Sequence, residues 1–110
     1  MDNSKPAITK DQIMLYFDKW ESLKPEIQLL YDQKQSNASE LMAIAIAHYE
    51  ELLEVCAPVG GSDRCTKMEP LNGEERLQFI KDKIVSPFAL IQLNLLYTEL
   101  RKKIARFITH

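Results

Sequence analysis

Apolar residues recur at three- and four-residue steps over the first third of the chain, which is the spacing of one face of an α-helix. The residues on this face are Ile13, Tyr16, Phe17, Trp20, Leu23, Ile27, Leu30 and Tyr31. Thr9 and Gln12 have the spacing of a capping box, which predicts that the helix begins near Lys10. The apolar face keeps its phase through Pro25, so we predict a kink there rather than a helix end.

A second helix is predicted from the capping-box pair Asn37 and Glu40 to about Cys56, where Pro58 and the Gly60-Gly61 pair would stop it. Its central apolar face should pack in the core. The residues on that face are Leu41, Ile44, Ala45, His48, Leu52 and Val55.

Two more helices are predicted in the last third of the chain. Asn72 and Glu75 have capping-box spacing and open a short helix, whose apolar residues are Leu77, Ile80 and Ile84. Ser86-Pro87 fits the cap and first residue of a fourth helix that reaches Phe107. The same two residues are also compatible with a kinked continuation of the third helix. The core face expected for the fourth helix consists of Leu90, Leu93, Leu96, Tyr97, Leu100, Ile104, Phe107 and Ile108.

No stretch alternates apolar and polar residues as a strand would. The pattern therefore predicts an all-α fold, a small antiparallel helical bundle of about four helices, in a single domain that spans residues 1–110. We expect a disordered tail at residues 1–8. All three glycines and two of the five prolines fall between residues 58 and 73, which predicts a long loop at residues 57–72.

Charge and composition narrow the classes of partner. The net charge of -2 gives no field that would attract nucleic acid or an anionic membrane. No apolar run resembles a secretory signal or approaches the length of a membrane span, so we expect a cytoplasmic protein without a membrane partner. In a reducing cytosol Cys56 and Cys65 would stay thiols, while export would allow a disulfide between them.

Catalytic and metal-binding patterns are weak. Gly60-Gly61-Ser62 lacks the lysine of a phosphate-binding loop. The potential metal ligands lack the spacing of a tetrahedral site; they are His48, Cys56, Asp63, Cys65 and His110. We therefore expect no enzyme activity, cofactor or metal. A small enzyme or metal-dependent regulator built on His48, Cys56 and Cys65 stays as an alternative that bound metal would support.

Two helices carry more apolar surface than one packing face needs. On the fourth helix Phe88, Ile91 and Leu95 form a second stripe nearly opposite the core face. On the second helix the apolar face is widened by Met42, Ile46, Tyr49 and Leu53. Either these are central helices with neighbours on two sides, or the extra residues form an exposed surface for an amphipathic partner helix. The same residues could form the interface of a homodimer.

Several segments are similar to the FliT family of flagellar export chaperones. The segments are Leu15-Tyr16-Phe17 with Trp20 and Leu23, Ile27-Gln28-Leu29-Leu30, Ala47-His48-Tyr49, Asn94-Leu95-Leu96, and Leu100-Arg101-Lys102-Lys103-Ile104. The resemblance implies a cytoplasmic chaperone that binds the C-terminal segment of the filament-cap protein before export, with its last helix covering or competing for the binding face. It also implies a second type of partner, a flagellar transcriptional regulator.

The first hypothesis is therefore a non-catalytic protein-binding module of export-chaperone type, whose partner is a secretion substrate or a regulator. It would hold an amphipathic partner segment on the apolar faces of helices two and four. The alternative is a small helical immunity or inhibitor protein that blocks a cognate toxin or enzyme. Its interface would use charged loop residues such as Asp63, Arg64 and Glu69.

Overall fold

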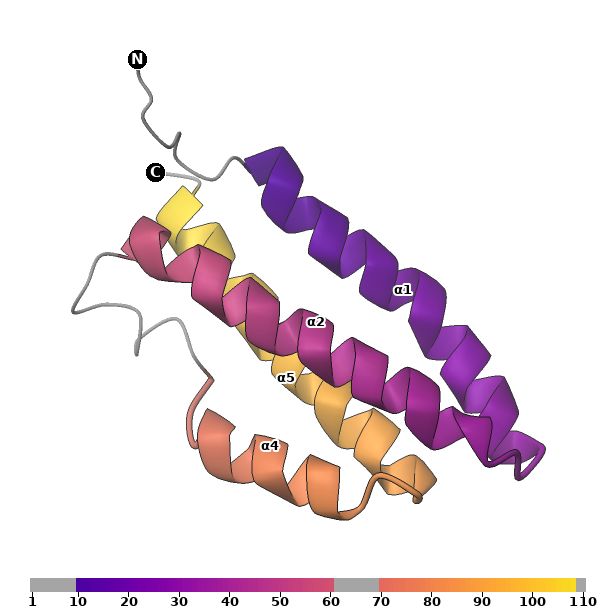
Figure 1. The fold of residues 1–110 in the computed structure, drawn as a ribbon. Coiled ribbons are helices and arrows are strands. Elements are labelled where there is room, and N and C mark those ends of the chain that lie inside the picture. Colours follow the sequence, from indigo (N-terminus) through magenta and orange to yellow (C-terminus); the bar gives the residue numbers. More distant parts are fainter. Residues whose placement is uncertain (1–9, 61–69, 109–110) are drawn as a thin grey trace.

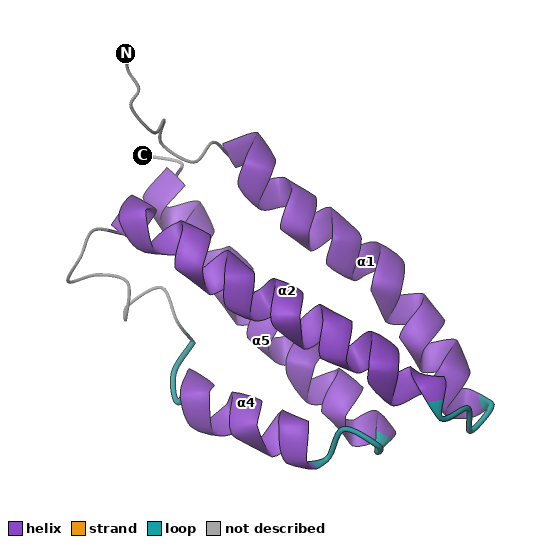
Figure 2. Cartoon of the chain, in the orientation of Figure 1, coloured by secondary structure: helices purple, strands orange, loops and turns teal. Residues whose placement is uncertain are grey.

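A computed structural model describes residues 10–60 and 70–108 of the chain. These two segments contain four helices and no strand (Figure 2). The helices are α1 (Lys10–Asp32), α2 (Asn37–Gly60), α4 (Gly73–Asp82) and α5 (Pro87–Ile108). The predicted all-α bundle of about four helices is confirmed. The expected tail at residues 1–8 and most of the expected loop at 57–72 lie outside the described residues.

The three long helices α1, α2 and α5 form the centre of the bundle, and each contacts the other two. Figure 1 shows α1 antiparallel to both α2 and α5, while the short helix α4 runs antiparallel to α5 at one side of the bundle. The contacts of α4 are mainly with α5. The fold is thus a three-helix core with a short fourth helix packed against it.

Helix α1 continues through Pro25 and ends with a backbone motif that no sequence signal indicated. Gln35 donates its N–H to the Leu30 carbonyl at 2.9 Å, and Lys34 donates to the Tyr31 carbonyl at 3.0 Å. This is the Schellman pattern, with Lys34 in the left-handed region at φ 58° where glycine is usual. The continuation through Pro25 is confirmed, and the kink there stays a prediction.

Helix α2 extends further than its sequence suggested. It continues through Pro58 to Gly60, so the predicted stop at Pro58 is wrong. The first residues of the loop predicted at 57–72 are therefore helical. Proline removes one helical hydrogen bond, the one to the carbonyl of Glu54. Because Glu54 is exposed, water can satisfy that carbonyl, and the break expected from the proline does not occur.

The start of α4 is not the predicted capping box. Asn72 directly precedes the helix, but it adopts the left-handed conformation (φ 55°, ψ 30°) and its side chain makes no capping hydrogen bond. A capping side chain needs an extended backbone to reach the first turn, which this conformation excludes. Instead, Arg76 donates from its guanidinium to the Leu71 carbonyl at 3.0 Å and ties the preceding turn to the helix.

The start of α5 is the predicted one. Ser86 accepts a hydrogen bond on Oγ from the N–H of Phe88 at 3.2 Å, and Pro87 is the first helical residue. At the end of α4, the N–H of Lys83 bonds the carbonyls of Phe79 and Ile80. Helices α4 and α5 are therefore separate, and the alternative of one kinked helix is wrong.

The ring of Tyr97 on α5 is the meeting point of the three long helices. It stacks on Trp20 of α1 at 4.5 Å between centroids and 6° between planes. It meets the rings of Phe17 and Tyr49 edge to face at 6.2 and 5.3 Å. Its hydroxyl donates to the Ala45 carbonyl of α2 at 2.8 Å. All the core residues predicted on α1 and, up to Ile104, on α5 are buried or packed against the buried cluster.

Three side-chain hydrogen bonds complete the packing of α1. The Trp20 indole N–H donates to Oδ1 of Asn94 on α5 at 3.0 Å, and the Lys24 ammonium donates to the same oxygen at 3.3 Å. At the C-terminal end of α1, the Tyr31 hydroxyl donates to the Ile84 carbonyl in the turn between α4 and α5. These bonds fix the position of α1 along the axis of α5.

Two replacements of Tyr97 should destabilise the fold to different extents. Tyr97→Phe keeps the stacked ring and removes one buried hydrogen bond, which should cost about 1 kcal/mol. Tyr97→Ala also removes the ring and leaves a cavity, and should cost about 3–5 kcal/mol. Urea denaturation followed by circular dichroism measures both, with Val85→Ala at an exposed position as the control. Equal losses for the two Tyr97 variants would contradict the role given to the ring.

High pH should weaken the fold through Tyr31. Burial raises the pKa of its phenol from 10.0 to about 12, so the fold favours the protonated form. The contribution is intact below pH 10 and is lost as the pH rises from 10 towards 12. Thermal unfolding of the parent chain and of Tyr31→Phe across this range should show a smaller alkaline loss in the variant. Parallel curves would show that Tyr31 does not titrate in this way.

Candidate functional site

The residues predicted to widen the apolar face of α2 do not form an exposed surface. Met42, Ile46 and Tyr49 are buried in the core, and Leu53 is half-buried against it. The reason is the position of α5, which packs on this side of α2 and brings Tyr97 against Tyr49. The expectation of an accessible face here is wrong, and the alternative of a central helix with neighbours on two sides is confirmed for α2.

Helix α2 is thus turned about its axis relative to the predicted orientation, and part of its predicted core face lies outward. Ala45 and Leu52 are buried as expected, but Ile44 is 45% exposed and His48 is only half-buried. Within the described residues, Nδ1 of His48 is buried and has no hydrogen-bond partner. Ile44 and His48 therefore lie at the edge of the α1–α2 interface rather than in the centre of the core.

The second stripe of α5 is exposed, which is one of the two arrangements that the sequence left open. Phe88, Ile91 and Leu95 keep 47%, 55% and 42% of their surfaces accessible. Phe79 of α4, which is 40% exposed, joins them by meeting the ring of Phe88 edge to face at 5.8 Å. We call these four residues the α4–α5 surface. Sequence reasoning missed Phe79, although its position out of phase with Leu77 and Ile80 on α4 was a signal for it.

Two ion pairs fix α4 so that Phe79 meets Phe88. Arg76 binds Glu99 of α5 through two parallel hydrogen bonds of 2.8 Å each. This contact with the Arg76 guanidinium lowers the pKa of the Glu99 carboxyl below its ordinary value. Lys81 binds Glu50 of α2 at 2.8 Å. Because Arg76 and Lys81 reach two different helices, α4 has a defined rotation in which Leu77 and Ile80 are buried.

Positive charge borders the α4–α5 surface on its C-terminal side. Lys102 is exposed and follows Leu95 by seven residues, which places both on the same face of α5. Arg101, one position earlier, instead lies over the Phe17 ring of α1 at 5.6 Å. Of Arg101 and Lys102, only Lys102 lies where it could contact a partner bound along Phe88, Ile91 and Leu95.

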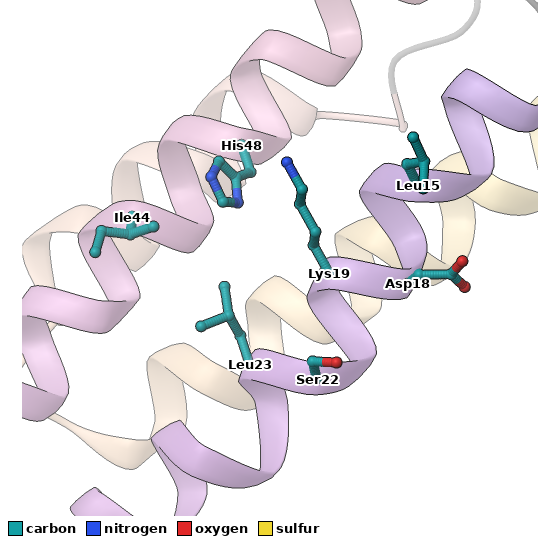
Figure 3. Close-up of a pocket in the computed structure, with 7 residues that line it drawn as sticks. All are labelled: Leu15, Asp18, Lys19, Ser22, Leu23, Ile44 and His48. Atoms are coloured by element: carbon teal, nitrogen blue, oxygen red, sulfur yellow. The ribbon is translucent and has the colours of Figure 1, made fainter.

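A groove of about 350 Å³ lies between α1 and α2. Figure 3 shows the Lys19 side chain reaching from α1 towards α2 beside the His48 imidazole, while Asp18 points away from both. The residues that line the groove are Leu15, Asp18, Lys19, Ser22, Leu23, Ile44 and His48. Four of these seven residues are polar or charged, but carbon atoms make up most of the lining surface, so the groove can bury a hydrocarbon group next to a few polar ones.

Other candidates for chemistry fall outside the described side chains. These residues are Cys56, Asp63, Arg64, Cys65, Glu69 and His110. The inhibitor alternative, which relied on Asp63, Arg64 and Glu69, therefore gains no structural support. Across residues 10–55 and 70–105, whose side chains the structure describes, no three His, Cys, Asp or Glu side chains come together in a way that could hold a metal ion. None of the described helices is long and apolar enough to cross a membrane.

A family model described as YpoC-like protein matches residues 10–109, which is nearly the whole chain. The chain belongs to the YpoC-like family. No curated protein and no solved structure matches it. The match therefore assigns the chain to a family, but its description names neither a binding partner nor a reaction.

This membership corrects the resemblance to the FliT flagellar chaperones, which the family match does not support. The residues that carried the resemblance have a structural explanation. Phe17 and Trp20 contact Tyr97 in the core, and Tyr49 is buried beside it. Aromatic residues at these spacings are what a small bundle needs for packing. The flagellar partners that the resemblance implied therefore lose their support.

Charged substitutions should separate the exposed residues from the buried ones. Ile91→Lys places its charge in water and should change the free energy of unfolding by no more than about 0.5 kcal/mol. Met42→Lys places a charge in a fully buried site and should unfold the chain or cost more than about 4 kcal/mol. Thermal unfolding of both purified variants provides the comparison. Similar melting temperatures for the two would contradict the assignment of α2 and α5 faces.

Proposed function

We propose that this YpoC-like chain is a non-catalytic protein-binding module, and that its α4–α5 surface holds an amphipathic helix of a partner protein. The observation that carries the proposal is the cluster of Phe79, Phe88, Ile91 and Leu95 on the outside of two adjacent helices. Scattered exposed apolar residues are ordinary in proteins, whereas large ones grouped together mark interaction surfaces.

The geometry of the surface suits a helical partner. Phe88, Ile91 and Leu95 are spaced as i, i+3 and i+7 on α5, and Phe79 of α4 lies beside Phe88. A partner helix with the same apolar spacing can lie along this stripe and pack its side chains between the rings and the aliphatic residues. Two aromatic rings at one end supply the large contact area typical of binding hot spots.

The chemistry of the surface favours binding over catalysis. Its four side chains are hydrocarbons, which can exclude water and supply burial energy but can neither transfer a proton nor attack a substrate. Lys102 beyond Leu95 adds a positive charge at one end of the stripe. We therefore expect the partner helix to carry an acidic residue at the matching end, which would set its direction on α5.

Crosslinking can identify the partner and test the surface together. A photoreactive phenylalanine analogue at Leu95, inside the α4–α5 surface, is compared with the same analogue at Leu29, an exposed leucine of α1. We expect position 95 to capture a protein that position 29 does not. With that protein purified, Ile91→Lys should weaken its binding at least about tenfold in calorimetric titration, because the mutation places a charge in an apolar interface.

Leu29→Lys is the matched control, since it introduces the same charge at a position of equal exposure on another helix. It should leave the affinity unchanged. The proposal fails if Ile91→Lys and Leu29→Lys bind the purified protein equally well. It also fails if position 95 captures only further copies of the same chain, because the surface would then be a dimer interface.

A further inference from the structure

The groove between α1 and α2 combines apolar side chains with polar groups that make few contacts in the fold. The Lys19 ammonium lies over the Tyr16 ring at 5.9 Å from its centroid, and Nδ1 of His48 bonds no described residue. Leu15 and Ile44 stand exposed at its two sides, 57% and 45% accessible, and Leu23 is half-buried between the helices. A hydrocarbon chain in this groove would cover these three residues. Filling the groove therefore removes apolar surface from water without any change in the bundle.

The polar groups of the groove are mainly hydrogen-bond donors. Lys19 carries a positive charge and reaches towards α2 beside the His48 ring (Figure 3). The ammonium donates only, and the imidazole and the Ser22 hydroxyl can each donate one hydrogen bond. Nδ1 of His48 is buried and bonds no described residue, so a ligand in the groove would meet another edge of the ring. Asp18, the one acidic lining residue, points away from Lys19 and His48 (Figure 3).

We propose that the α1–α2 groove binds a small aliphatic carboxylate, with its hydrocarbon chain on Leu15, Leu23 and Ile44 and its carboxylate at Lys19 and His48. The volume of about 350 Å³ lies at the lower end of the range for small-molecule sites, which are mostly apolar with a few placed polar groups. One ammonium matches the single charge of a carboxylate better than the double charge of a phosphate ester.

This inference does not depend on the proposed protein-binding function. The groove uses the sides of α1 and α2, whereas the α4–α5 surface uses residues of two other helices. Variants in one leave the other unchanged, so the two proposals succeed or fail separately.

The test is an NMR titration of the full ¹⁵N-labelled chain with two probes of equal chain length, octanoate and octylamine. Octanoate should shift the amide signals of Leu15, Lys19, Leu23, Ile44 and His48 and saturate with a dissociation constant of about 1 mM or tighter. Octylamine is protonated and brings a positive charge next to the positive charge of Lys19, so it should bind at least about fivefold more weakly. Equal binding of the two probes, or shifts centred on Phe88 and Ile91, would overturn the proposal.

Charge reversal supplies the matched variants. Lys19→Glu should invert the preference, so that octylamine binds more tightly than octanoate, and circular dichroism should show the helices intact because Lys19 is exposed. Lys102→Glu makes the same change of net charge on α5 and should keep the preference of the parent chain. If Lys102→Glu alters the preference as much as Lys19→Glu does, the effect comes from overall charge and the assignment of the groove is wrong.

Discussion

The contact of Tyr97 with Trp20 and with the Ala45 carbonyl is the constraint on which the rest of the bundle depends. The stacked rings set the rotation of α5 against α1, and the hydroxyl sets it against α2. With Tyr97 facing inward, the helical period turns Phe88, Ile91 and Leu95 outward. Glu99, two positions further, then lies where Arg76 of α4 can bind it. One buried aromatic residue thus determines both the core and the shape of the exposed apolar surface.

The helix boundaries could largely be predicted, because their signals are local. Ser86-Pro87 is one such signal, and the structure uses it as a cap. The rotation of α2 could not be predicted, since apolar residues cover more than half of its circumference and periodicity alone does not say which arc meets which neighbour. Ile44 therefore lies outside and Met42 inside, against expectation. The left-handed residues Lys34 and Asn72 were missed because their conformations depend on the backbone around them.

The two candidate sites differ in how far sequence could anticipate them. The stripe on α5 was predictable because α5 has one clear core face, which leaves the opposite residues outward. Phe79 joins that stripe only through the packing of α4 on α5. The α1–α2 groove depends on the unforeseen rotation of α2, which brings His48 to the edge of the core. The FliT resemblance failed for a related reason, since the residues behind it serve packing in bundles of many families.

The attachment of α4 through ion pairs makes the α4–α5 surface sensitive to ionic strength. Arg76, Glu99, Lys81 and Glu50 are all partly exposed, so dissolved ions reach both pairs and weaken them as salt concentration rises. The buried residues Leu77 and Ile80 keep α4 near α5, because salt does not screen apolar contacts. The angle at which Phe79 meets Phe88 is then the part of the surface that counterions can change. The surroundings of the chain, and not only its partner, take part in shaping the apolar stripe.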